Sequence, residues 1–207
     1  MRIRSGRIFA SLVVVGALSL TAIPASAAAP ARFAANLSPV PHTADGGSTV
    51  TGNASLRQLT KNVQVKLSAS GLSPNLPHLV HIHGRVQAQN ECPGIEADAN
   101  GDGLIDTLDG LPAYGPVLVT FSTEGTTSPA VGFDPSVAPI ADASGNLVYE
   151  RSIRVSEDIR SNLGRLHIVV HGLDLNGNGI YDGPISTSGV MLELELPVAC
   201  GRININN

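Results

Sequence analysis

Alternation of apolar and polar residues with a period of two is the feature that most constrains the fold of this chain. Every second position is apolar in segments 63–69, 117–121 and 192–196. Successive side chains of a strand point to opposite faces, so this pattern is typical of half-buried strands. Turn clusters such as 71–75 and 143–146 separate the segments without a recurring helix. The pattern predicts an all-β fold, an antiparallel sandwich or barrel.

The chain is expected to hold one structured domain. We place this domain at residues 49–207, after a flexible lead-in at 28–48 that is rich in alanine, proline and glycine. A length of about 180 residues is enough to bury one core. Only residues 157–163, with Ser156 as N-cap, look helical, and this helix is expected to be short.

Residues 1–27 have the three parts of a secretory signal peptide: early arginines, the apolar run Ile8–Leu20, and the small residues Ala25-Ser26-Ala27. Cleavage is expected near Ala27. The apolar run is too short for a membrane anchor, so we expect a secreted, soluble protein.

The charge balance argues against two classes of partner. The leader holds three of the 13 basic residues and no acid, so the remaining 10 basic and 17 acidic residues give a net charge of −7. This charge argues against nucleic acid and anionic membranes as partners. The sequence identifies no protein partner.

The two cysteines, Cys92 and Cys200, lie far apart in an exported chain. An oxidised pair is the expected state there, and closing a loop of that length stabilises a fold by about 4 kcal/mol in the chain-entropy model. The alternative is two independent buried thiols.

Two strand-like segments, 78–84 and 164–172, hold five of the six histidines. On a strand His81 and His83 project the same way, roughly 6.5 Å apart, and can clasp one ion. A third ligand must come from elsewhere, and His171 ends a run typical of a buried central strand. Several neutral imidazoles favour copper or zinc. The alternative is a set of structural histidines hydrogen-bonded across strands.

The remaining histidines fit other positions. His167 lies four residues from His171, roughly 13 Å along a strand, so we expect a core or supporting residue instead of a ligand to the same ion. His78 has the opposite parity to His81, which argues against ligation. His42 lies in a proline-flanked loop and is expected to be solvated, although a loop could also bring it toward the site.

Residues 98–109 carry the oxygen pattern of a calcium loop, with glycine at the sixth position. The predicted ligands are Asp98, Asn100, Asp102, the Leu104 carbonyl, Asp106 and Asp109. The flanks Cys92-Pro93-Gly94 and Gly110-Leu111-Pro112 predict no helix on either side, hence an isolated loop on a β scaffold. The alternative is a surface turn, because Asp, Asn and Gly favour turns for local reasons.

A weaker copy of this pattern follows the last histidine. Its candidate ligands are Asp174, Asn176, Asn178, the Ile180 carbonyl and Asp182. Only two of them are carboxylates, so lower calcium affinity is expected, and a simple connecting turn is the favoured interpretation.

Several of these pieces together resemble a known family. Gly71-Leu72-Ser73-Pro74 followed by His78-x-x-His81-x-His83, and Gly164-Arg165 leading to Val169-Val170-His171, are similar to segments of the copper-zinc superoxide dismutases. The resemblance implies a Greek-key β-sandwich or barrel. It further implies copper on His81, His83 and His171, with His78 in support and a Cys92–Cys200 disulfide.

The chain also departs from that family. No histidine occurs between Gly84 and Leu166, so the ligands of the family's zinc site are missing and zinc is not expected there. Pro197 stands where the family has its substrate-guiding arginine. The chain also resembles chordin-type CHRD domains of bacterial secreted proteins, which share the His-x-His-x-Gly segment and have no assigned chemistry.

Two functional hypotheses follow. The first is a secreted protein with a mononuclear copper site that could dismutate superoxide, with enzymatic activity left open because the bridging histidine and guiding arginine are missing. The second is a non-catalytic, calcium-stabilised extracellular module that binds a partner or sequesters metal. The chain has no Gly-x-Ser-x-Gly or His-Glu-x-x-His motif, which argues against a hydrolase.

Overall fold

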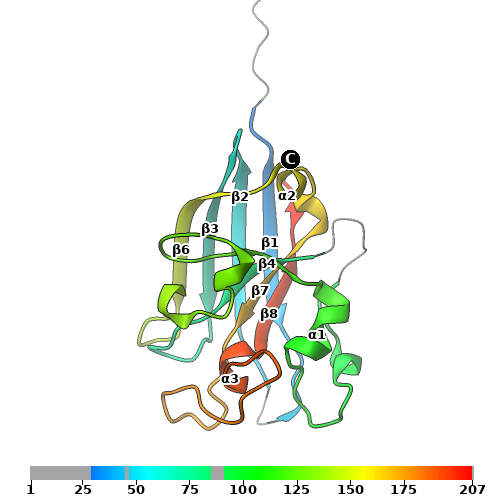
Figure 1. The fold of residues 1–207 in the computed structure, drawn as a ribbon, viewed down its shortest axis with the longest axis vertical. Coiled ribbons are helices and arrows are strands. Elements are labelled where there is room, and N and C mark those ends of the chain that lie inside the picture. The colour runs from blue at the N-terminus through cyan, green and yellow to red at the C-terminus, as the bar shows by residue number, and fades with distance from the viewer. Residues whose placement is uncertain (1–28, 45–46, 85–90, 207) are drawn as a thin grey trace, which may run out of the picture.

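The chain folds around one curled antiparallel sheet (Figure 1). The computed structural model describes residues 29–44, 47–84 and 91–206. The strands are β1 (Arg32–Pro39), β2 (Thr51–Gln58), β3 (Asn62–Ser70), β4 (Val80–His83), β5 (Val117–Thr120), β6 (Leu147–Arg154), β7 (His167–His171), β8 (Pro197–Arg202) and β9 (Asn204–Ile205). Three short α-helices accompany them: α1 (Thr107–Tyr114), α2 (Glu157–Ser161) and α3 (Leu192–Glu195).

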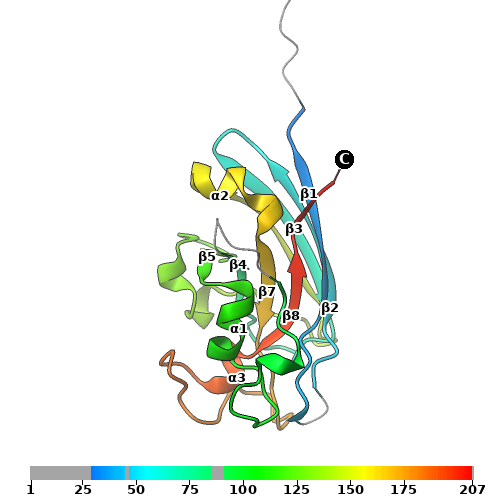
Figure 2. The ribbon, with the colours of Figure 1, turned by 90° about the vertical axis from the view of Figure 1, so that its right-hand side faces the viewer.

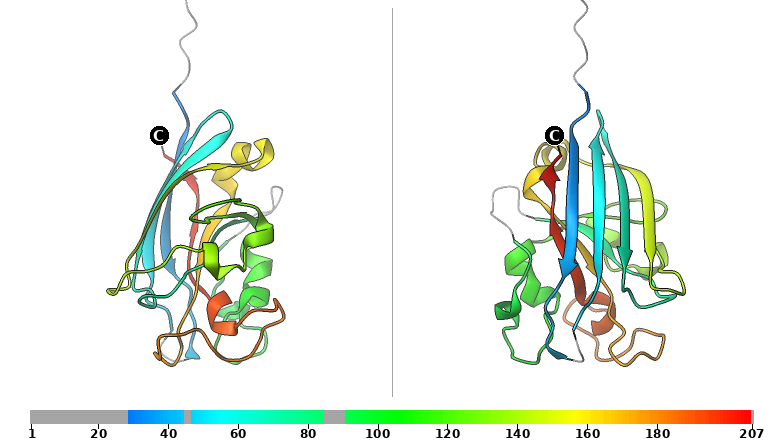
Figure 3. Two further views of the ribbon diagram at one scale, coloured as in Figure 1. Left: turned by 60° about the vertical axis from the view of Figure 1, so that its left-hand side comes forward. Right: turned by 180° about the vertical axis from the view of Figure 1, so that it is seen from behind.

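The strand order is β5-β4-β7-β8-β1-β2-β3-β6, with β9 beside β1. Because β3 pairs with β6 and β4 with β7, the chain crosses between the two ends of the sheet, as in a Greek key. Figure 2 shows β1, β2 and β3 on one side, and β4, β5 and the helices on the other. Figure 3 shows β1, β2, β3 and β6 side by side from behind. The prediction of an all-β barrel or sandwich is confirmed.

The period-two pattern forms the core as expected. In β3 the side chains of Val63, Val65, Leu67 and Ala69 are buried, and the residues between them are partly or fully exposed. They pack in one continuous apolar cluster with residues of β1, β6 and β7. Burial of these faces is what fixes the register of each strand.

Side chains of β6 join the two ends of the curled sheet. Arg151 donates from Nη1 to the carbonyl oxygen of Ser122 at 2.7 Å and from Nη2 to that of Gly125 at 2.7 Å. The Tyr149 hydroxyl donates to the same Ser122 carbonyl at 3.1 Å, and its ring stacks on Phe121. These bonds satisfy carbonyls beyond the end of β5 in place of ladder hydrogen bonds.

The predicted lead-in at 28–48 is wrong over its central part. Residues 32–39 form β1, which lies inside the sheet between β8 and β2. Phe33, Ala35 and Leu37 alternate into the core, so this segment has the same period-two pattern as the other strands. The domain therefore begins before residue 49. The predicted signal peptide lies in the part of the chain outside the described residues.

The expectation that no helix flanks the loop 98–109 is also wrong. A 3₁₀ turn at Ile95–Ala97 precedes it, and helix α1 begins at Thr107. The Asp106 carboxylate accepts from the Leu108 and Asp109 backbone N–H groups, and the Asp109 carboxylate accepts from the Asp106 backbone N–H. This capping box starts the helix despite Gly110 and Pro112 within it.

The strand predicted at 192–196 is a helix instead. Leu192–Glu195 forms α3, and the side chains of Glu193 and Glu195 are buried. Glu193 accepts from the Leu175 N–H at 3.1 Å and from the Asp182 N–H at 2.8 Å. A carboxylate with two such partners can be buried, which the alternation of leucine and glutamate does not indicate.

The predicted helix at 157–163 is confirmed at its start. Helix α2 spans Glu157–Ser161, and the Ser156 hydroxyl accepts from the Ile159 N–H at 3.2 Å. The chain then tightens into a 3₁₀ turn at Leu163–Arg165. Within the described residues, none of the helices has the length and apolar character needed to cross a membrane.

The disulfide prediction is confirmed. Cys92 and Cys200 are bonded across a sequence separation of 108 residues. The bond ties the segment that leads into α1 to strand β8. It therefore closes a loop that contains most of the residues around the histidines described next.

Candidate metal centre

Strands β4 and β7 bring three histidines together. The strands are antiparallel, with His81 opposite Val169 and His83 opposite His167, so these side chains share one face of the sheet. His171 lies two residues beyond Val169 on the same face, at an irregularity in the β7–β8 pairing. The period-two argument therefore placed His81 and His83 on the correct face, and His171, which the family resemblance implied as the third ligand, lies on that face too.

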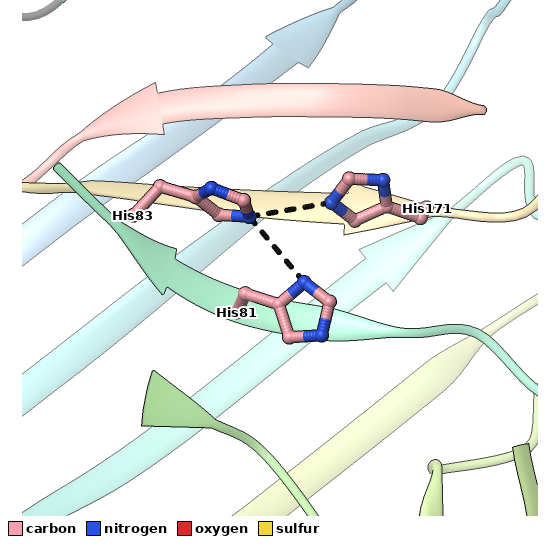
Figure 4. A group of neighbouring side chains, drawn as sticks. All are labelled: His81, His83 and His171. Carbon is pink, nitrogen blue, oxygen red and sulfur yellow. Dashed lines mark hydrogen bonds between the residues drawn. The ribbon is translucent and has the colours of Figure 1, made fainter. Parts of the chain in front are cut away.

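The three rings form a compact cluster (Figure 4). One nitrogen from each ring lies within 4.8 Å of the other two. His83 Nε2 is 3.3 Å from His81 Nδ1 and 3.4 Å from His171 Nε2. The three side chains are between 0 and 1 % exposed. We call His81, His83 and His171 the histidine trio.

The second nitrogen of each ring faces a backbone carbonyl. His81 Nε2 donates to Gly132 at 2.9 Å, His83 Nδ1 to Gly115 at 2.8 Å, and His171 Nδ1 to Glu195 at 2.7 Å. A carbonyl oxygen can only accept, so each of these nitrogens carries the proton of its ring. In neutral rings the three inward nitrogens are then all acceptors.

Burial keeps these rings neutral. Burial, reinforced by the nearby His171, lowers the pKa of His83 to about 3, and burial lowers that of His171 to about 4. Burial together with the two neighbouring rings lowers the pKa of His81 well below its ordinary value. The inward nitrogens therefore lack the proton that a hydrogen bond between them would need. An unmatched buried acceptor costs about 1–3 kcal/mol, and a cation at the centre would remove that cost.

Helix α1 covers one side of the trio. The ring of Tyr114, which is fully buried, meets the ring of His83 edge to face, with centroids 4.6 Å apart. Its hydroxyl donates to the Thr107 carbonyl at 3.3 Å, and burial raises its pKa. A side chain on Gly110 would strike the Tyr114 hydroxyl, since an added Cβ would lie 2.4 Å from it. Glycine at 110 thus permits this packing.

The structure places His78 and His167 next to the trio but outside it. His78 Nδ1 is 3.0 Å from the His171 carbonyl oxygen, the position expected of a supporting residue. His167 is buried and its Nδ1 has no hydrogen-bond partner among the described residues. Neither ring joins the group that could hold an ion.

The expectation of a solvated His42 is wrong. His42 is 7 % exposed, donates from Nε2 to the Pro197 carbonyl at 2.8 Å and accepts from the Ile105 N–H at 3.0 Å. It therefore joins the predicted calcium loop to the start of β8. Both of its ring nitrogens are occupied, so it is a structural residue and does not reach the trio.

In both aspartate-rich loops, the first aspartate side chain accepts hydrogen bonds from the same two backbone positions. The Asp98 carboxylate accepts from the Gly101 and Gly103 N–H groups at 2.8 and 2.9 Å. Its counterpart Asp174 accepts from Gly177 and Gly179, both at 2.8 Å. The weaker copy thus folds as the first loop does.

Neither loop brings its carboxylates together as tightly as the trio brings its nitrogens. Among the described residues, the trio is the one group of three or more His, Cys, Asp or Glu side chains whose ligand atoms all lie within 4.8 Å of one another. In the first loop Asp106 and Asp109 are bonded to backbone N–H groups of the α1 capping box. In the second, Asp182 accepts from the side-chain amides of Asn176 and Asn178. Calcium binding stays a prediction for both loops.

Sequence reasoning missed the groups that hold the rings in place. Three backbone carbonyls, at Gly115, Gly132 and Glu195, come from loops and helix ends far apart in the chain. Tyr114 belongs to a helix that was not predicted. A backbone carbonyl leaves no mark in the sequence. The capping box Asp106–Asp109 was the one local signal that pointed to α1.

The buried histidines predict that the metal-free protein loses stability in acid. Burial lowers the pKa of His83 to about 3 and those of His167 and His171 to about 4, from 6.5 in the unfolded chain. Between pH 6.5 and 4 the unfolded chain binds more protons, so stability falls across that window and is independent of these groups above it. At pH 5 each ring costs about 2 kcal/mol. Thermal unfolding between pH 8 and 4.5 measures this, and a constant midpoint from pH 7 to 5 would contradict it.

Comparison with known proteins gives no further assignment. No protein-family model matches the chain, and no curated protein matches it significantly.

Proposed function

We propose that this protein is a secreted copper-binding protein that holds one ion between His81, His83 and His171. The observation that carries the proposal is the convergence of three ring nitrogens whose partner nitrogens are all committed to backbone carbonyls. If the histidines were purely structural, three buried acceptor nitrogens would face one another without a hydrogen-bond donor. A metal ion satisfies all of them at once.

Copper suits this donor set better than other common ions. Imidazole nitrogen binds copper and zinc, and copper forms the more stable complexes in the divalent series. The carbonyl partners fix the orientation of each ring, as outer partners of metal-binding histidines do. The Cys92–Cys200 disulfide supports an oxidising, extracytoplasmic setting, in keeping with the predicted signal peptide.

Superoxide dismutation is the catalytic form of this proposal, suggested by the resemblance of the histidine segments to copper-zinc superoxide dismutases. Copper would supply one-electron redox chemistry between its two oxidation states. The trio's rings are between 0 and 1 % exposed, covered by α1, α3 and the segment around Gly132. Small anions would reach the centre only if a covering segment moved, so turnover would require such a movement in every catalytic cycle.

Metal analysis of the purified mature protein tests the proposal. We expect one copper per chain after loading and removal of loosely bound metal, detected by mass spectrometry of the native protein. A superoxide assay on the same sample then separates an enzyme from a copper-holding protein. A protein that retains no stoichiometric copper or other metal at the trio would overturn the proposal.

A second candidate function is a calcium-stabilised, non-catalytic extracellular module. The matched hydrogen bonds of the loops at 98–109 and 174–182 favour it, because they turn both loops in the same way around their first aspartate. Glu193 fastens both ends of the second loop, at Leu175 and Asp182. Hard oxygen ligands on such turns suit calcium.

Calcium addition should therefore stabilise the protein. At a free concentration 100 times the dissociation constant, calcium would raise the free energy of unfolding by about 2.7 kcal/mol. Asp98→Asn should lose this gain, because it removes the charge; its single amide oxygen also keeps only one of the two turn hydrogen bonds, to Gly101 or to Gly103. The exposed Asp158→Asn is the matched control and should keep it. An unfolding midpoint that does not respond to calcium would exclude the module's calcium requirement.

A further inference from the structure

We infer that the histidine trio selects the cuprous ion, Cu⁺, over Cu²⁺ and Zn²⁺. The inference rests on the proposed metal site and adds the charge of the ion that fits it. Three features carry it: the charge of the ligands, the burial of the site, and the small number of ligands held in place.

All three ligands are neutral. Each ring donates its one N–H to a backbone carbonyl, so its other nitrogen offers a lone pair and the ring carries no charge. The group of converging side chains contains no carboxylate and no cysteine. A bound divalent ion would therefore keep both of its charges, and a cuprous ion one.

The site is buried among apolar groups. Val169, opposite His81, is fully buried and packs in one cluster with Tyr114 and Ile105. The cost of transferring an ion from water into such a medium grows with the square of its charge, so a divalent ion costs about four times as much as a monovalent one. The nearby Glu195 accepts from His171 through its backbone carbonyl. Its side chain is buried and its Oε2 has no hydrogen-bond partner among the described residues, but its carboxyl is not part of the converging group.

The ligand number points the same way. Cupric copper favours square-planar or tetragonal sites, and zinc favours four ligands. Here three nitrogens from two neighbouring strands are fixed by carbonyls on separate segments, so the cluster resists opening to a fourth ligand. A monovalent ion with few ligands matches both the charge and the geometry.

Competition titrations test the inference on the intact, disulfide-bonded mature protein. Cu⁺ is supplied without oxygen in ascorbate and buffered by a cuprous-specific chelator, and Cu²⁺ and Zn²⁺ are titrated separately. We expect Cu⁺ to bind at least roughly 100-fold more tightly than Cu²⁺. Each tenfold increase in this affinity ratio raises the reduction potential of bound copper by about 59 mV. Equal or tighter binding of Cu²⁺ or Zn²⁺ would overturn the inference and leave the metal site standing. Failure to bind any of the three ions would instead overturn the proposed function.

A matched pair of variants isolates the role of charge. Val169→Asp places a carboxylate on the shared face, and Val169→Asn places a neutral group of nearly the same shape there. The aspartate should reduce the preference for Cu⁺ over Cu²⁺ at least tenfold relative to the asparagine, because it compensates the second charge. Equal preferences in two folded variants would refute the charge argument. If either variant fails to fold, by circular dichroism, the wild-type affinities alone still decide the inference.

Discussion

Replacing His171 with alanine should abolish stoichiometric copper binding. His171 supplies one of three converging nitrogens and is the one ligand from β7. Loss of an outer partner of a metal ligand typically costs 10–100-fold in affinity, and loss of a ligand itself should cost more than about 100-fold. Copper at 1,000 times its dissociation constant stabilises a protein by about 4.1 kcal/mol, so His171→Ala should also lose that gain in thermal unfolding.

The control for this prediction is His167→Ala. His167 is on the same strand and equally buried, but it lies outside the trio. Its variant should keep one copper per chain, with any loss of stability unrelated to metal. The copper affinity of His78→Ala should lie between those of the other two variants, because His78 is not a ligand but contacts the His171 carbonyl. Copper retained by His171→Ala, measured beside His81→Ala, would show that the metal binds elsewhere.

At neutral pH, removing the disulfide should produce the largest loss of stability among the substitutions considered. Replacing both Cys92 and Cys200 with alanine opens a link between residues 108 apart. For a loop of about 100 residues, the chain-entropy model gives about 4.7 kcal/mol, slightly more than the round figure expected from the sequence. A typical domain is stable by about 5–15 kcal/mol, so the double variant should be close to unfolding at 37 °C. Urea unfolding at 25 °C measures the difference directly.

The double variant should also weaken copper binding. Cys200 lies opposite Val169 on β8 and packs in one cluster with Tyr114. The disulfide thus helps to hold α1, whose following residue Gly115 accepts from His83. We expect a loss of roughly 10–100-fold in affinity, the usual cost of an outer partner. A Cys92→Ala single variant controls for a free thiol. A change in unfolding free energy below about 1 kcal/mol would contradict the entropic argument.

The local sequence pattern was sufficient to predict the core-facing residues of the sheet and the strand face on which the histidines lie. The alternation in β3 predicted which residues enter the core, and the same parity rule placed His81 and His83 together. Parity also kept His78 out of the trio, and the separation of roughly 13 Å along a strand from His171 kept His167 out, as the structure has them. These predictions succeeded because the orientation of a strand side chain depends only on its position along the strand.

Local pattern failed where distant contacts decided the outcome. The leucine–glutamate alternation at 192–196 predicted a strand, but Glu193 is buried as the acceptor of two N–H groups from the preceding loop, at Leu175 and Asp182, which a pattern confined to 192–196 does not include. The predicted lead-in at 28–48 contains β1 because its backbone groups form hydrogen bonds with β2 on one side and β8 on the other. His42 is buried for the same kind of reason, since its partners at Ile105 and Pro197 are remote in sequence.

The sequence by itself determined the β class, the core faces and the shared face of His81 and His83, because these follow from residue type and strand parity. His171 as the third member of the trio and the Cys92–Cys200 pair followed from the resemblance of several segments to a known family. The tertiary structure alone decided what the histidines can do. The carbonyls of Gly115, Gly132 and Glu195 each accept the N–H hydrogen bond of one ring, and burial keeps the rings neutral. Hydrogen bonds to backbone atoms and exclusion of water depend on how the chain is packed, and no residue letter records either of them.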